Sequence, residues 1–230
     1  PHYGALSVAG PNAPALLSDA AGQDLREAAL PPMGVREGHI AGVPVRVLRL
    51  GFVSRVGYEV HFPADGAVTV WDALQVAGKP HGLRPFGVEA QRVLRLEMGH
   101  VLIGRDTDAL TNPCEANLGW ALKMDKPFFV GQRSLRILAG KPPTRQLAGF
   151  VLDPDHRGPL PEECHLVIDD GAIAGRVTSI ARSPSTGAVI GLAYVRPGQA
   201  VPGTVFRIRG ERGVLVQATV TPPPFHREED

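Results

Sequence analysis

The stretch Lys141-Pro142-Pro143-Thr144-Arg145 separates two parts of the chain that differ in composition. Consecutive prolines interrupt both helices and central strands, so they are typical of a connection between elements. After this stretch, turn residues separate short apolar runs at 147–152, 165–168, 173–180, 188–195, 205–208 and 214–220. Six short strands with no helix between them predict a small all-β barrel or jelly roll over residues 145–226.

Residues 1–140 have the pattern of an α+β region. Asn12 can cap a first helix, and the Pro-rich stretch 30–34 should end that helical part. Alternating runs at 43–50 and 58–62 predict two strands. Further helices are expected at 65–78, capped by Asp65 and with Val68, Trp71 and Leu74 on one face, at 88–96 and at 134–138. The predicted fold is an α+β region followed by a small all-β domain.

The composition excludes several classes of protein. The chain has 24 Lys and Arg against 23 Asp and Glu, and a net charge of +1 gives no basic surface for nucleic acid or for an anionic membrane. No apolar run is long enough to span a bilayer. Cys114 and Cys164 lie far apart and lack metal-ligand spacing, so free thiols in a reducing compartment are expected. We therefore expect a cytoplasmic protein with no metal, nucleic-acid or membrane partner.

The predicted helix 88–96 and the residue that follows it carry the most informative charges. Glu97 is in register with apolar residues of the helix, where an unpaired buried carboxylate would be costly. Arg92 and Arg95 form an adjacent stripe, on which two guanidinium groups repel unless an anion or a polar ligand lies between them. Arg95 can equally form a structural ion pair with Glu97 or Glu59. Residue spacing leaves both interpretations open.

Glu59 is a second candidate for a binding residue. It lies in the predicted strand 58–62, whose alternation places it on the face opposite Tyr58 and Val60. A carboxylate there can accept two parallel hydrogen bonds from a flat ring with adjacent donors, or it can face water. Nucleotide-binding glycine loops, zinc-protease motifs and serine nucleophile elbows are absent from the sequence, so no catalytic residue is assigned.

Several motifs, read in chain order, resemble the aminomethyltransferase family, which includes the T-protein of the glycine cleavage system. They are V-x-G-P-x-A at 8–13, G-[FY]-E-[IV] at 57–60, L-R-L-E-x-G at 94–99, L-G-W at 118–120 and F-[IV]-G-[KQ]-x-x-L at 129–135. Residues 95–108 and 175–184 are most similar to the folate-binding C-terminal part of the α subunit of heterotetrameric sarcosine oxidase. The resemblance covers nearly the whole chain.

The resemblance implies a tetrahydrofolate site. In the family the glutamate of G-[FY]-E holds the pterin ring, which is Glu59 here, and the arginine of L-R-L-E is a second folate contact, which is Arg95. His226 follows Pro224-Phe225 and matches the position of an aromatic folate contact that is Tyr in the family. A flavin, which amine oxidation requires, is expected only on a partner subunit.

The family also carries a long segment before V-x-G-P-x-A, and this segment holds the acidic residue thought to assist the transfer. Because the chain starts close to that motif, we expect the folate-binding region at 1–140 to be N-terminally incomplete. The expected partners are folate and either a flavoprotein amine oxidase or dehydrogenase subunit or a chain that supplies the missing half.

Three functions are compatible with this pattern. We expect tetrahydrofolate-dependent one-carbon transfer in a sarcosine oxidase-like or T-protein-like amine-degrading system. The first alternative is a non-catalytic folate-binding module similar to the iron–sulfur assembly relatives of the fold, whose motif is K-G-C-[FY]-x-G-Q-E. Phe128 stands at the position of that cysteine, which argues against this branch. The second alternative is a degenerate domain kept for assembly.

Overall fold

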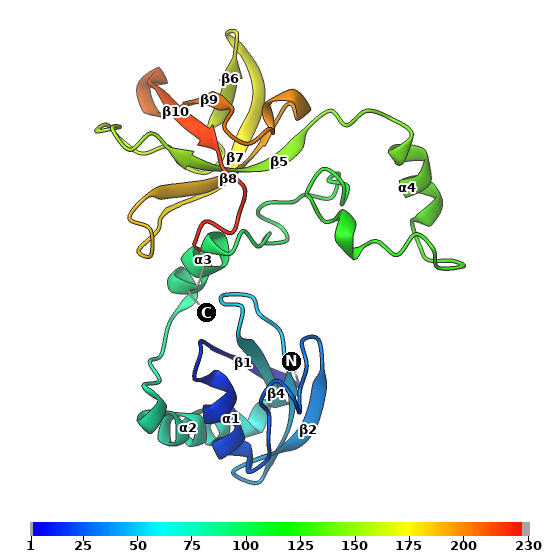
Figure 1. The fold of residues 1–230 in the computed structure, drawn as a ribbon, viewed down its shortest axis with the longest axis vertical. Coiled ribbons are helices and arrows are strands. Elements are labelled where there is room, and N and C mark those ends of the chain that lie inside the picture. Colours follow the sequence, from blue (N-terminus) through cyan, green and yellow to red (C-terminus); the bar gives the residue numbers. More distant parts are fainter. Residues whose placement is uncertain (1, 227–230) are drawn as a thin grey trace. The chain divides into compact units, whose positions relative to one another are not determined.

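The computed structural model describes residues 2–226. The chain divides into two compact units, Pro1–Leu94 and Arg95–Asp230 (Figure 1). Each unit has an apolar core, formed from strands and helices in the first and mainly from barrel strands in the second. Among the described residues, no helix combines the length and the apolar character needed to cross a bilayer.

The first unit is a four-stranded antiparallel sheet with strand order β1-β4-β3-β2. Its strands are β1 (Tyr3–Ala9), β2 (Val35–Ile40), β3 (Val43–Leu48) and β4 (Gly57–Pro63), and its helices are α1 (Ala13–Ala21) and α2 (Ala67–Gly78). Tyr58, Val60 and Phe62 of β4 are buried in one core with side chains of both helices. The two helices therefore pack on the face of the sheet opposite Glu59.

The structure confirms the predicted strands β3 and β4. It differs from the prediction in where the first helix ends and in two further strands. The early helix ends at Ala21, because Gly22 adopts a left-handed φ of 62° that terminates it well before the prolines at 31 and 32. Strands β1 and β2 are not predicted from the sequence pattern. Their residues alternate only weakly in polarity, so their strand conformation depends on pairing with β4 and β3.

The predicted apolar face of α2 is wrong in a way that matters for the site. The buried residues of α2 are Val70, Leu74 and Gly78, whereas Val68 is 71% exposed and Trp71 is 41% exposed. The helix begins after Gly66, and Asp65 lies in a short 3-10 turn before it. The helix is therefore rotated relative to the prediction, and its tryptophan is available at the surface.

The second unit contains a closed barrel, and all six predicted strands are present. Its strand order is β10-β5-β8-β7-β6-β9. The strands are β5 (Gln146–Leu152), β6 (Leu166–Asp169), β7 (Ala172–Arg182), β8 (Val189–Val195), β9 (Val205–Arg209) and β10 (Leu215–Val220). Every neighbouring pair is antiparallel. The predicted α+β region with a C-terminal all-β barrel is confirmed.

Strand β8 is buried along its whole length because it is covered on both sides. Val189, Ala193 and Val195 belong to the barrel core, whereas Ile190, Leu192 and Tyr194 pack in a second cluster with Leu96. Leu96 lies in α3 (Val88–Glu97). The last turn of α3 therefore packs on the outside of the barrel.

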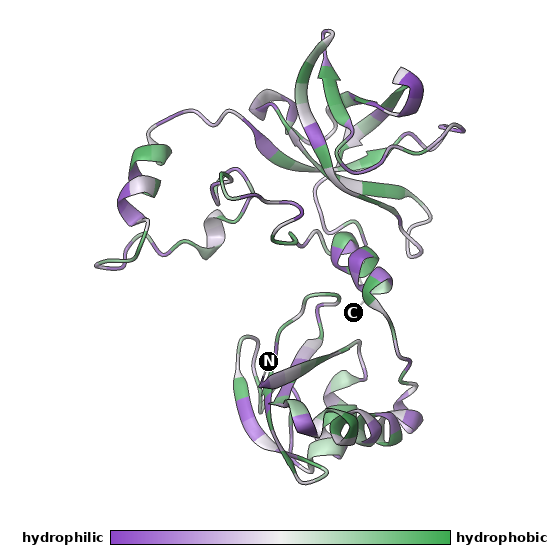
Figure 2. Ribbon diagram, turned by 180° about the vertical axis from the view of Figure 1, so that it is seen from behind, coloured by the Kyte–Doolittle hydropathy of each residue, from purple (hydrophilic) through white to green (hydrophobic). Residues whose placement is uncertain are grey.

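The division into compact units falls inside α3, not at the predicted connection 141–144. Residues after Leu94 bond to the barrel: the Leu147 amide donates to the carbonyl of Glu115 at 2.7 Å, and Asn117 donates to the Leu147 carbonyl at 2.6 Å. The same stretch includes α4 (Gln132–Ala139), on which hydrophilic and hydrophobic residues are interleaved (Figure 2). The domain boundaries 1–140 and 145–226 stay a prediction.

Candidate functional site

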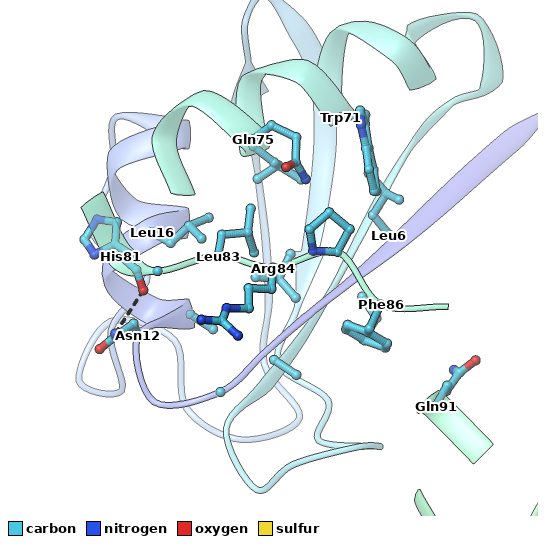
Figure 3. A pocket seen from close by; sticks show the side chains of 18 of the residues that line it. Leu6, Asn12, Leu16, Trp71, Gln75, His81, Leu83, Arg84, Phe86 and Gln91 are labelled. Carbon is cyan, nitrogen blue, oxygen red and sulfur yellow. Dashed lines mark hydrogen bonds between the residues drawn. The ribbon is translucent and has the colours of Figure 1, made fainter. Parts of the chain in front are cut away.

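A cavity of about 670 Å³ opens in the first unit (Figure 3). It is lined by β1, the start of α1, the exposed side of α2, the segment 81–88, Glu59 of β4 and Gln91 of α3. Gly82, with a left-handed φ of 74°, turns the chain after α2 into the non-helical segment that forms one wall. A cavity of this volume is within the range of small-molecule and cofactor sites.

Glu59 contributes a carboxylate to this cavity. It lies on the face of β4 opposite Tyr58 and Val60, as the alternation predicts. Its Oε2 is 2.9 Å from Nε2 of His61, and its side chain is 38% exposed. No described residue donates a hydrogen bond to its Oε1. The carboxylate is therefore partly held and still able to accept hydrogen bonds from a ligand.

Two aromatic side chains give the cavity an apolar lining. Trp71 projects from α2 and Phe86 from the segment after Gly82, and each is 41% exposed (Figure 3). Rings exposed to this extent provide flat surfaces on which a planar heterocycle can stack. Together with Glu59 they match a flat ligand that has hydrogen-bond donors at one edge.

Polar groups line the remaining wall of the cavity. Gln75 and Gln91 present amides, and Arg84 is exposed with no carboxylate paired to it among the described residues. The Asn12 amide donates to the carbonyl of His81 at 3.1 Å and so links the start of α1 to the wall. Its side chain makes no capping hydrogen bond to α1, so the predicted cap is wrong. The wall can therefore interact with both neutral and anionic ligand groups.

Arg95 lies in the second unit, in a buried network. Its Nη1 donates to Asp106 Oδ2 at 2.6 Å and to the His100 carbonyl at 2.9 Å, and its Nη2 donates to Ser179 Oγ at 2.6 Å. The side chains of Arg95 and Asp106 are 2% and 0% exposed. The ion-pair interpretation therefore identifies a real interaction, but the partner is Asp106 and not Glu97 or Glu59. The folate contact of Arg95 stays a prediction.

Glu97 is also buried and fully partnered. It accepts hydrogen bonds from the hydroxyls of Ser183 and Ser185, the latter at 2.8 Å. These serines lie at the turn between β7 and β8, so the carboxylate links α3 to the barrel. The cost of burying a carboxylate on this helix is thus offset by charge-assisted hydrogen bonds.

His226 also belongs to the second unit and is half-buried at the end of the described chain. The amide of the preceding Phe225 donates to the Glu97 carbonyl at 2.7 Å, which holds this end of the chain to α3. Of the three predicted folate residues, only Glu59 lines the cavity of the first unit. Arg95 and His226 are placed by contacts of the second unit.

The aromatic lining of the site does not follow from the helical and strand periodicity of the sequence. The spacing of Trp71 places it on one helix face with Val68 and Leu74, and no pattern singles out Phe86. A usable signal was present in Arg84-Pro85-Phe86-Gly87, where Pro and Gly flank a large aromatic residue outside any predicted element. An aromatic residue in such a connection lies outside the helices and strands that form the core, so it is a candidate for ligand binding.

Two family models match the chain. The GCVT N-terminal domain matches residues 1–126, and the glycine cleavage T-protein C-terminal barrel domain matches residues 145–226. The chain belongs to the glycine cleavage T-protein family. This confirms the resemblance that the motifs had indicated.

Relatives in the family are aminomethyltransferases. The chain is 38% identical over 220 residues to the aminomethyltransferase of Halothermothrix orenii and 37% identical over 227 residues to that of Saccharopolyspora erythraea. These matches cover 94% and 98% of this chain and 60% of each relative. The crystal structure of glycine cleavage system aminomethyltransferase T from Bartonella henselae superimposes with a TM-score of 0.83 at 28% identity, over 97% of this chain and 60% of that one. The chain thus spans about 60% of the length of these relatives.

Proposed function

We propose that this chain binds tetrahydrofolate and contributes to folate-dependent one-carbon transfer. The observation that carries the proposal is the position of Glu59. The glutamate of the family motif G-Y-E-V lines a cavity, and its Oε1 is unpaired among the described residues. Membership of a family whose relatives are aminomethyltransferases supports the same conclusion.

The residues of the cavity fit such a ligand. A pterin is flat and has adjacent N–H and amino donors at one edge. A carboxylate can accept two parallel hydrogen bonds from these donors. Trp71 and Phe86 offer surfaces for stacking, and Arg84 offers a cation for a carbonyl or carboxylate of the ligand. In this proposal the chain contributes binding and orientation, which place a folate nitrogen beside the reactive carbon.

The source of the carbon belongs to the same proposal. We infer that the chain acts in a T-protein-like or sarcosine oxidase-like amine-degrading system, in which a flavin on a partner subunit oxidises the amine. The similarity of residues 95–108 and 175–184 to the sarcosine oxidase α subunit supports this choice. The alternative is a non-catalytic or degenerate folate-binding or assembly module, which would bind folate or a partner without turnover.

We place the protein in the cytoplasm. The support is chemical: Cys114 and Cys164 are both free and exposed. Exposed free thiols are typical of proteins that work in a reducing compartment.

Titration with tetrahydrofolate tests the proposed function. The chain is titrated alone and with a co-purifying flavoprotein, and the Glu59→Gln variant is compared with Asp65→Asn, an exposed carboxylate before α2 that has no ion pair among the described residues. We expect Glu59→Gln to weaken binding roughly tenfold or more, since hydrogen bonds to a charged acceptor contribute about 1.5–3 kcal/mol. Asp65→Asn should bind like the parent protein.

An unchanged dissociation constant in Glu59→Gln would refute the assignment of the pterin site. Saturable binding without one-carbon transfer in the presence of the flavoprotein and its amine would favour the non-catalytic alternative. Absence of tetrahydrofolate binding in every combination would overturn the proposed function.

A further inference from the structure

Glu59 and His61 form a pair on one strand. They lie two residues apart on the same face of β4, and Nε2 of His61 is 2.9 Å from Oε2 of Glu59. Both side chains are partly exposed, at 38% for Glu59 and 36% for His61. Only Glu59 lines the cavity, so the histidine contacts the carboxylate from outside the binding space.

The neighbouring strands offer no competing partner for this carboxylate. On β1, Ser7 is opposite Glu59 and Ala5 is opposite His61. On β3, Leu48 is opposite Glu59 and Arg46 is opposite His61.

Arg46 is the nearest cross-strand cation, and its Nε donates to Glu37 Oε1 at 2.9 Å. It is therefore already paired within the sheet. Among the described residues, His61 is the one group that bonds to the Glu59 carboxylate.

We propose that His61 is a positioning residue that orients the Glu59 carboxylate for its ligand. The inference rests on the proposed function, because it deepens the role of the same site. An Nε2–H donor on one oxygen fixes the rotation of the carboxylate, and a carboxylate with one such donor keeps further acceptor capacity for a ligand. A carboxylate held in its bound orientation before the ligand arrives loses less entropy on binding.

The test compares three variants with the parent protein in tetrahydrofolate titrations at pH 8. We expect His61→Ala to raise the dissociation constant several-fold at pH 8 with a melting temperature close to that of the parent. His61→Gln, which keeps a donor, should restore most of the affinity. The control is His39→Ala, an exposed histidine on β2 with no partner among the described side chains.

A second measurement needs no ligand. Nitrogen-15 NMR of the His61 ring at pH 8 should show the proton on Nε2, the atom that faces Glu59; a proton on Nδ1 would overturn the proposal. Parent-like affinity in His61→Ala, or an equal loss in His39→Ala, would overturn it as well. If the parent protein itself fails to bind tetrahydrofolate, the proposed function is wrong. If the parent protein binds and His61→Ala binds equally well, only the role of His61 is wrong.

Discussion

At the scale of single residues, Arg95 shows how a charged side chain in a family motif can be structural. Its guanidinium has three acceptors, and two of them, Asp106 and Ser179, come from other parts of the second unit. Thr178 also donates to Asp106, at 2.6 Å, so the carboxylate has several donors. Such a network stabilises the fold only while every member is present.

Replacing Arg95 with Met should destabilise the protein strongly. The change leaves Asp106 buried without its counter-ion, which costs about 3–5 kcal/mol of unfolding free energy. Chemical denaturation measures the loss. Arg92→Met is the matched control, because Arg92 pairs with Glu89 at the surface, where such pairs contribute about 0–1 kcal/mol.

The same variant separates the two roles considered for Arg95. It is titrated with tetrahydrofolate under conditions in which it is still folded. Unchanged affinity would assign Arg95 to structure alone, whereas weaker binding by folded Arg95→Met would support the predicted folate contact. Parent-like stability in Arg95→Met would contradict the importance of the buried pair.

At the scale of elements, the two edges of the sheet in the first unit differ in protection. Edge strand β2 carries Arg36, Glu37 and His39, whereas β1 has no charged residue and no proline. The bonds from Gly10 to the Val56 carbonyl and from Ala64 to the His2 carbonyl show that even-numbered residues of β1 face β4. Backbone groups of the odd-numbered residues therefore point away from the sheet. An uncharged edge of this kind can pair with another strand.

Adding a charge to β1 should reduce self-association of the chain. Ala5 is exposed and has an outward-facing backbone, so Ala5→Lys places a charge on the edge without disturbing the pairing with β4. Analytical ultracentrifugation at rising concentration should show less association than for the parent protein. Val35→Lys on the opposite, already charged edge is the control and should change little. Equal association of Ala5→Lys and the parent would show that the β1 edge is not used.

At the scale of the whole molecule, each unit contains a buried tyrosine that responds to alkaline pH. Burial raises the pKa of Tyr58, whose hydroxyl donates to the Leu25 carbonyl at 3.1 Å, and burial likewise raises the pKa of Tyr194 in the barrel. The neutral form is favoured in the folded state. The resulting stability is fully present below the pKa of an unfolded tyrosine, near 10, and is lost as pH rises above it.

Thermal unfolding between pH 8 and 11 measures this effect. The melting temperature should be stable up to about pH 9.5 and then fall as the unfolded state loses tyrosine protons. Tyr58→Phe removes the contribution of the first unit, so its melting temperature should depend less steeply on pH. Parallel pH curves for Tyr58→Phe and the parent would contradict the role of Tyr58.

The amino-acid sequence by itself determined the barrel, the central strands and the family. Turn residues separate short apolar runs in the barrel, and alternation in β4 places Glu59 opposite the core. These features are local, because strand periodicity and turn chemistry depend on residues close in the sequence.

Only the tertiary structure decided which side chains meet. Arg95 pairs with Asp106 and Ser179, which lie 11 and 84 residues away, and α2 turns Trp71 to the surface although its spacing suited a core. A helix can bury any of several faces, and a buried charge takes whichever donors or acceptors the fold brings to it. Such choices depend on contacts between distant segments, so they follow from packing and not from local pattern.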